Sequence, residues 1–70
     1  SREIRIFKTM GDKGLLSLSH LAKTLKLPIA TVHRLVERFE NKGFVVSKRV
    51  GKERAIELTE KGRIMLALLS

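Results

Sequence analysis

The stretch PIATVHRLVERFENKGFVV, residues 28–46, changes from a helical pattern to a strand pattern within a few residues. Pro28 lacks a backbone N–H and suits the first turn of a helix, where that group would have no partner. Apolar residues then recur at the spacing i, i+3, i+4 and i+7, at Val32, Leu35, Val36 and Phe39. Gly43 can take the left-handed conformation that ends many helices. We therefore predict an amphipathic helix over about residues 28–42, followed by a strand.

The face of this helix opposite the apolar stripe is mostly polar. At 100° per residue, four side chains project from it: Ala30, Arg34, Glu37 and Asn41. Three more lie on its flanks: Thr31, His33 and Arg38. A helix of this kind packs its apolar face on a core and leaves the other face to solvent or to a partner.

A first helix is predicted at the N-terminus, where Ser1 can act as its cap. Its apolar residues recur at helical spacing, at Ile4, Phe7 and Met10. The two glycines of GDKG, residues 11–14, should end this helix, because glycine is a poor helix former. Leu15–Leu16 then forms a short apolar segment that we interpret as an edge strand.

A second, short helix should follow that segment. Either Ser17 or Ser19 can serve as its N-cap. One of its faces is apolar and comprises Leu18, Leu21, Ala22 and Leu25. Pro28 biases Leu27 away from the helical conformation, so a sharp turn is expected between this helix and the next.

Residues 44–58, FVVSKRVGKERAIEL, change to the two-residue period of β-strands. We predict a hairpin that closes over Val50-Gly51-Lys52. The register that gathers four apolar side chains on one sheet face pairs Phe44 with Leu58 and Val46 with Ile56.

The same predicted register arranges the charges of the hairpin. It sets Arg49 opposite Glu53, a favourable pair, and Lys48 opposite Arg54. Two like charges that face each other cost stability, and an anion bound beside them would offset that cost.

A last helix is predicted after the hairpin, with Thr59 as its cap and Glu60 in its first turn. Its end, residues 64–69, is apolar all round, and such a helix belongs in a buried setting. We expect Ile64 and Leu68 to lean on the first helix, while three side chains point elsewhere: Met65, Leu66 and Leu69. Two interpretations of these three stay open, burial in a symmetric homodimer or packing against a further domain.

The composition limits the partners of the chain. Its 70 residues include no cysteine, which excludes disulfides and thiolate metal sites and fits a reducing cytoplasm. Fifteen Lys and Arg against seven Asp and Glu give a net charge of +8. Such an excess indicates a polyanionic partner, either nucleic acid, which we favour, or an acidic membrane surface. The longest apolar run is too short to span a bilayer. We expect residues 1–70 to form one domain cut from a longer chain.

The predicted order of elements is helix, short helix, tight turn, helix, hairpin and final helix. This is the order of an α+β winged helix-turn-helix, a three-helix bundle with a C-terminal β-hairpin wing and a final helix. Three segments carry a family resemblance: SLSHLAKTLKLP (17–28), ATVHRLVERFENKGFV (30–45) and LTEKG (58–62). With them, residues 16–63 resemble the winged-helix domains of the multiple-antibiotic-resistance (MarR) and isocitrate-lyase-type (IclR) regulators. The resemblance implies a prokaryotic or archaeal transcription regulator that binds specific double-stranded DNA.

The resemblance also implies roles for the polar residues. The third helix would enter the major groove and read bases through Ala30, Thr31 and Arg34. The charge pattern, apart from the resemblance, indicates the phosphate contacts, because the wing carries four cations and one acid within residues 48–54. We expect these contacts to come from the flanks of the helix and from the wing, through His33, Arg38, Lys48, Arg49, Lys52 and Arg54. Two alternatives remain: Arg34 could pair with Glu37 on the surface, and the cations of the wing could be ordinary solvated charges.

No catalytic or metal site is indicated by the sequence. Three hydroxyl residues have no acid–base partners, and helix capping explains them: Ser17, Ser19 and Thr59. His20 and His33 lack a further His or Cys ligand. We expect no enzyme and no cofactor. Two other classes stay open, a protein–protein assembly module and a regulatory head fused to an enzyme. An assembly module would more often expose an apolar patch on the third helix than Arg34 and Arg38.

Overall fold

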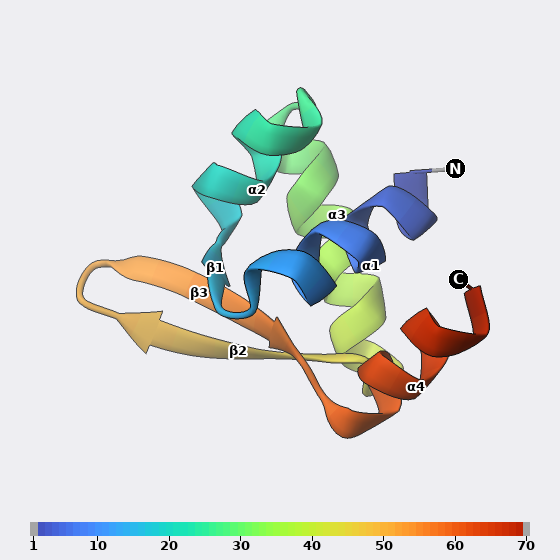
Figure 1. Ribbon diagram of the computed structural model, residues 1–70. Helices are drawn as coiled ribbons and strands as arrows, with labels where there is room; N and C mark the ends of the chain where they lie inside the picture. The colour runs from blue at the N-terminus through green and yellow to red at the C-terminus, as the bar shows by residue number, and fades with distance from the viewer. Residues whose placement is uncertain (1, 70) are drawn as a thin grey trace.

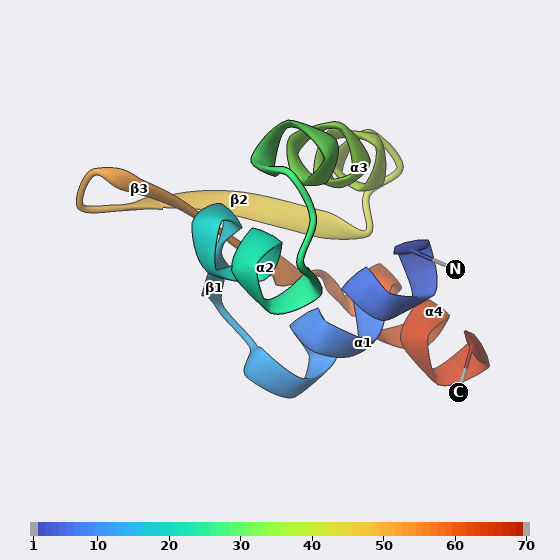
Figure 2. The same cartoon turned by 90° about the horizontal axis from the view of Figure 1, so that it is seen from above.

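The computed structural model describes residues 2–69. The elements follow one another along the chain as α1 Arg2–Lys13, β1 Leu16–Ser17, α2 Leu18–Leu25, α3 Ile29–Asn41, β2 Val45–Val50, β3 Glu53–Leu58 and α4 Glu60–Leu69. Figure 1 and Figure 2 show the β2–β3 hairpin extending away from the helices as a wing. The predicted α+β winged helix-turn-helix fold is confirmed. The proposed cap Ser1 lies outside the described residues.

Helix α1 continues past the point where the sequence analysis placed its end. The prediction that GDKG, residues 11–14, breaks the helix was wrong, because α1 runs to Lys13 and ends before Gly14, whose φ is 73°. Gly11 has a packing role instead. A Cβ at this position would lie 2.3 Å from Cδ2 of Leu66, so the glycine lets α4 approach α1 closely.

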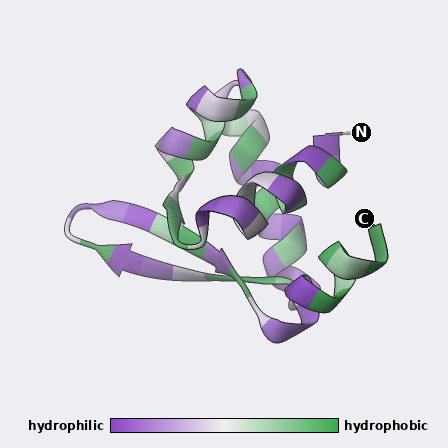
Figure 3. Cartoon of the chain, viewed as in Figure 1, coloured by the Kyte–Doolittle hydropathy of each residue, from purple (hydrophilic) through white to green (hydrophobic). Residues whose placement is uncertain are grey.

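The core lies between the helices and one face of the sheet. The ring of Phe7 packs against Phe39 and Phe44, with centroid distances of 4.7 and 5.7 Å. Ile6 is fully buried, whereas Ile4, which the helical spacing singled out, is only half-buried. Figure 3 shows that α4 is apolar over much of its length, whereas much of the outer part of the wing is hydrophilic.

The helix-turn-helix unit follows the predictions closely. Ser17 is the N-cap of α2, and its side chain accepts a hydrogen bond from the backbone N–H of His20 at 3.1 Å. The helix ends at Lys26, which adopts a left-handed conformation with a φ of 58°. Helix α3 begins directly after Pro28 and ends at Asn41. The predicted apolar faces of both helices are buried: Leu18, Leu21, Ala22, Leu25, Val32, Leu35, Val36 and Phe39.

The sheet has the strand order β1–β3–β2, with all pairs antiparallel. The predicted edge strand is present, one residue further on, as Leu16–Ser17. The predicted register of the hairpin was wrong by one residue. The structure pairs Val45 with Leu58, Val46 with Glu57, Ser47 with Ile56, Lys48 with Ala55, Arg49 with Arg54, and Val50 with Glu53. The loop is therefore Gly51-Lys52, and the positive φ of Gly51, 63°, suits the first position of a two-residue hairpin turn.

The position of Phe44 explains the shift in register. Its N–H donates to the carbonyl of Phe39 at 2.9 Å, and its own carbonyl accepts from the N–H of Thr59 at 3.0 Å. Phe44 thus links α3 to the start of α4 and is not part of the strand. Val45 takes the first inward position of β2, so Val46 faces outward and is 40% exposed.

The start of α4 is fixed by its cap and by a glycine. The Oγ1 atom of Thr59 accepts from the N–H of Gly62 at 3.1 Å and donates to the carbonyl of Gly43 at 2.6 Å, which confirms the predicted cap. Gly62 lies directly against the chain before β2. A Cβ at this position would be 2.1 Å from the carbonyl oxygen of Phe44.

The predicted orientation of α4 was wrong for Ile64, Met65, Leu66 and Leu68, whereas Leu69 is 39% exposed, as expected. Met65 and Leu66 pack against the core, whereas Ile64 is 56% and Leu68 is 75% exposed. Gly62 accounts for this difference. Residues three and four positions apart share a helix face, so the glycine that touches the chain before β2 also turns Met65 and Leu66 inward. Ile64 and Leu68 then point to the opposite side.

Candidate nucleic-acid interface

The outward face of α3 has the composition that the sequence analysis predicted. Ala30, Arg34, Glu37 and Asn41 are all exposed on it. The predicted alternative in which Arg34 pairs with Glu37 does not occur, because Arg34 has no ion-pair partner among residues 2–69. The guanidinium group of Arg34 is therefore available to a partner.

A groove of about 220 Å³ separates the N-terminal part of α3 from the wing. It brings His33 of α3 together with Lys52 of the wing loop and Arg54 of β3. Ser17 and the carboxylate residue Glu53 also line this groove. The structure thus gathers three of the predicted phosphate ligands on the wing side of α3.

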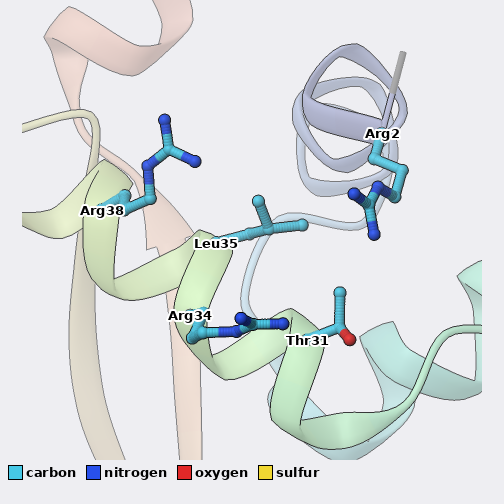
Figure 4. A pocket seen from close by; sticks show the side chains of 5 residues that line it. All are labelled: Arg2, Thr31, Arg34, Leu35 and Arg38. Atoms are coloured by element: carbon cyan, nitrogen blue, oxygen red, sulfur yellow. The ribbon is translucent and has the colours of Figure 1, made fainter.

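A second groove, of about 300 Å³, lies on the other side of α3 (Figure 4). Thr31, Arg34, Leu35 and Arg38 line it from α3, and Arg2 lines it from α1. Figure 4 shows Arg2 extending from α1 toward α3 near Thr31, with Leu35 between Arg2 and Arg38. Arg2 was missed in the sequence analysis, because only the packing of α1 beside α3 brings it to this position.

Arg54 is held by side chains that the sequence analysis did not single out. Its guanidinium group forms an ion pair with Glu40, and its Nε donates to Oγ of Ser47 at 3.1 Å. The hydroxyl of Ser47 in turn donates to Glu40 at 2.8 Å. This cluster of Glu40, Ser47 and Arg54 ties the wing to α3. It also offsets the repulsion between Arg54 and Arg49, which are directly opposite each other.

The remaining cations of the wing lie in different places. The predicted pairings of Arg49 with Glu53 and of Lys48 with Arg54 were wrong, because the register differs. Arg49 shares a sheet face with Arg54, since residues directly opposite in an antiparallel pair lie on one face. Lys48 lies on the other face, where its Nζ is 2.7 Å from Oε1 of Glu57. Lys48 is thus not gathered with the other predicted ligands.

The hydroxyl and histidine residues of the described chain form no further site. Ser17 and Thr59 act as helix caps, with their side-chain oxygens bonded to backbone N–H groups. Within residues 2–69, no three His, Asp or Glu side chains come together as a metal-binding group. In the same range, no helix is long and apolar enough to cross a bilayer.

A short helix that braces a second one, an exposed face on that second helix and a two-stranded wing together define a winged helix-turn-helix domain. The sequence pattern of the IclR helix-turn-helix domain matches residues 2–49. The chain belongs to this family.

Solved structures share the fold over nearly the whole chain. FabT of Streptococcus pneumoniae, in complex with DNA, has a TM-score of 0.90 at 24% identity over 97% of this chain and 50% of FabT. The transcriptional regulator BldR of Sulfolobus solfataricus has a TM-score of 0.86 at 26% identity over 94% of this chain and 49% of BldR. A mutant MarR of E. coli, complexed with operator DNA, has a TM-score of 0.92 at 15% identity over 97% of this chain and 51% of MarR.

The chain spans about half the length of each of these proteins. Among curated protein sequences, none matches the chain.

Proposed function

We propose that the chain is the sequence-specific DNA-binding domain of a prokaryotic or archaeal transcription regulator, with α3 in the major groove of double-stranded DNA. The observation that carries this proposal is the exposed position of Arg34 on the outward face of α3, together with a groove on the wing side of the same helix that His33, Lys52 and Arg54 line. A base-reading arginine next to a row of phosphate ligands is the arrangement that major-groove recognition needs.

Each predicted residue has a role in this proposal. Ala30 and Thr31 lie at the N-terminal end of α3, where recognition helices approach bases, and Arg34 can form a bidentate contact with guanine. The phosphate ligands are His33, Arg38, Arg49, Lys52 and Arg54, with the wing on the backbone or in the minor groove. Lys48 lies on the other sheet face and is paired with Glu57, so its contribution to phosphate binding is the smallest of the set.

The matched structures support the partner and the class of function. FabT and MarR were solved with DNA, and BldR is a transcriptional regulator. By analogy, this domain has no enzymatic activity and needs no cofactor, and it acts in the cytoplasm. The matched proteins are about twice as long as this chain, so we propose that the chain is one domain of a longer regulator. The analogy is one of fold and family, and the geometry of the exposed face of α3 gives it a physical basis.

We also propose that the regulator is a homodimer that uses α4. Ile64 and Leu68 are exposed on one face of this helix, and burying them against a second copy would remove apolar surface from water. A symmetric pair with its two recognition helices about 34 Å apart would read a palindrome.

The test begins with selecting duplexes from a random pool and measuring binding by fluorescence polarisation at several salt concentrations. If four to six phosphates are neutralised, the slope of log K against log salt should be about −4 to −5. A slope near zero would contradict DNA binding and favour a protein–protein module.

Two variants then separate reading from positioning. Arg34→Ala should cost about 1–3 kcal/mol on the selected site and far less on random DNA. Lys52→Ala should weaken binding to the selected site and binding to random DNA equally, because phosphate contacts carry no sequence information. Equal losses on specific and random DNA for Arg34→Ala would show that α3 is not the reader.

A further inference from the structure

The groove between α1 and α3 is strongly cationic. Three guanidinium groups line it, those of Arg2, Arg34 and Arg38, and no carboxylate does. None of the three arginines has an ion-pair partner among residues 2–69. The groove therefore concentrates positive charge, although Glu37 lies with Arg34 and Arg38 in an adjoining hollow without forming an ion pair.

The width of a helix places DNA backbone on both sides of α3. An α-helix with its side chains is about 10–12 Å across, and the major groove is about 12 Å wide. A helix seated in that groove has one strand's phosphates along each flank. His33, Lys52 and Arg54 serve the flank beside the wing. The flank away from the wing is the one along which Arg2 and Arg38 lie.

We propose that Arg2 holds a phosphate of the DNA strand that runs along the side of α3 away from the wing, and that Arg38 contacts the same strand further along the groove. This inference rests on the proposed binding of DNA by α3. It adds a ligand from α1, so the two strands are held from two different parts of the fold. Arg2 is a positioning contact, because a phosphate carries no sequence information.

The form of the groove favours a backbone phosphate over a free anion. Sites for small ligands are concave and bury most of the ligand's surface. Here the three arginines are exposed, and only Leu35 at the base of the groove is buried. An open cationic groove beside the base-reading Arg34 suits a phosphate that other contacts already hold in place.

The first experiment compares Arg2→Ala with Arg63→Ala in the polarisation assay. Arg63 is a matched control, an exposed arginine near the start of α4 that lies in a groove with Met10 and Glu57, away from α3. Arg2→Ala should reduce affinity about three- to fivefold on both specific and random duplexes. It should also make the salt slope shallower by about 0.9, as expected for one lost phosphate contact. Arg63→Ala should change both values clearly less, and equal effects of the two variants would overturn the proposal.

The second experiment locates the contact on the DNA. Neutral methylphosphonates replace the phosphates of the selected duplex one at a time. At one position on the strand away from the wing, the replacement should lower the affinity of the wild-type chain for the duplex. The same replacement should leave the affinity of Arg2→Ala unchanged. If Arg2→Ala is as sensitive as the wild type at every position, the proposal is wrong. Thermal melting of Arg2→Ala and Arg63→Ala is the control that each variant is folded, so that a loss of affinity is not caused by unfolding.

Three further outcomes separate this inference from other readings. If inorganic phosphate shifts the amide resonances of Thr31 and Arg38 while Arg2→Ala leaves DNA affinity unchanged, the groove binds a free anion and the proposal fails. If the wild-type chain binds no duplex, the proposed function itself fails. In a third outcome, the wild type binds duplex and Arg34→Ala loses specificity as described, but Arg2→Ala and Arg63→Ala have the same affinity and salt slope. That outcome would contradict only the role of Arg2.

Discussion

Replacing Gly62 by alanine should destabilise the domain strongly, although alanine is the better helix former. The new Cβ would lie 2.1 Å from the carbonyl oxygen of Phe44 and 3.1 Å from Cδ2 of Leu58. The backbone of Phe44 cannot easily retreat, because it is hydrogen-bonded to Phe39 and to Thr59. Overpacking of this kind costs about 3 kcal/mol where backbone must move, and the helix propensity of alanine returns about 1 kcal/mol. The expected net loss is about 2 kcal/mol.

The assay is thermal and urea unfolding followed by circular dichroism. For a domain of this size, a loss of 1 kcal/mol lowers the melting temperature by about 4–8 °C, so Gly62→Ala should melt about 8–16 °C below the wild type. Gly11→Ala is the matched control. Its Cβ would meet only the end of the Leu66 side chain, which can change rotamer, so its stability should stay within about 1 kcal/mol of the wild type. If Gly62→Ala melts at or above the temperature of Gly11→Ala, the reasoning from the close approach to Phe44 is refuted.

Three other substitutions test the charges of the wing and the face of α4. Glu40→Gln removes the negative charge of the partner of Arg54, so urea unfolding should show a loss below about 1 kcal/mol for this partly exposed pair. The same variant should bind random duplex more tightly, because it removes a negative charge beside the phosphate ligand Arg54 while the glutamine oxygen can still accept a hydrogen bond from it. Weaker binding would show that the ion pair's positioning of Arg54 matters more than the repulsion between Glu40 and the phosphates. Lys48→Ala should weaken duplex binding less than Lys52→Ala in polarisation measurements, because Lys48 lies on the far face of the sheet, and the reverse order would contradict that placement. Leu68→Glu should abolish dimers seen by sedimentation, whereas a chain that is monomeric at millimolar concentration without the substitution would exclude this interface.

The sequence was sufficient for the elements whose apolar residues recur at helical spacing. The apolar faces of α2 and α3 were predicted residue by residue, because a single period of 3.6 places each of them on one side of a helix. The capping hydroxyl of Thr59 was also recognised, because a cap needs only a short side chain at one local position. For α2 the sequence left Ser17 and Ser19 open, and the structure shows that Ser17 is the cap.

The register of the wing could not be obtained in the same way. Phe44, Val45 and Val46 are consecutive apolar residues, so alternation alone does not tell which of them faces the core. The choice is made by the backbone of Phe44, which is bonded to both α3 and α4. The prediction that Gly11 helps to end the first helix was wrong for a similar reason. Local helix propensity does not report the contact between Gly11 and Leu66 of α4.

The parts of the candidate site that were missed depend on contacts between distant segments. Arg2 comes beside α3 only through packing, and no local pattern marks it. Glu40 lies on the flank of α3 that faces the wing, but its partner Arg54 could be identified only once the register was known. The residues found from the sequence are those on the exposed face of one helix, where periodicity is enough.

The two-residue loop Gly51-Lys52 makes the wing a preorganised arm. A hairpin closed by so short a loop has few alternative conformations, and the part of β3 next to the loop is tied to α3 through Arg54 and Glu40. Ordering a flexible segment on binding costs about 0.5–1.5 kcal/mol for each long side chain that is immobilised, in addition to the backbone. The wing avoids the backbone part of this cost, so its docking onto a duplex should be close to a rigid-body event with little change in its hydrogen exchange.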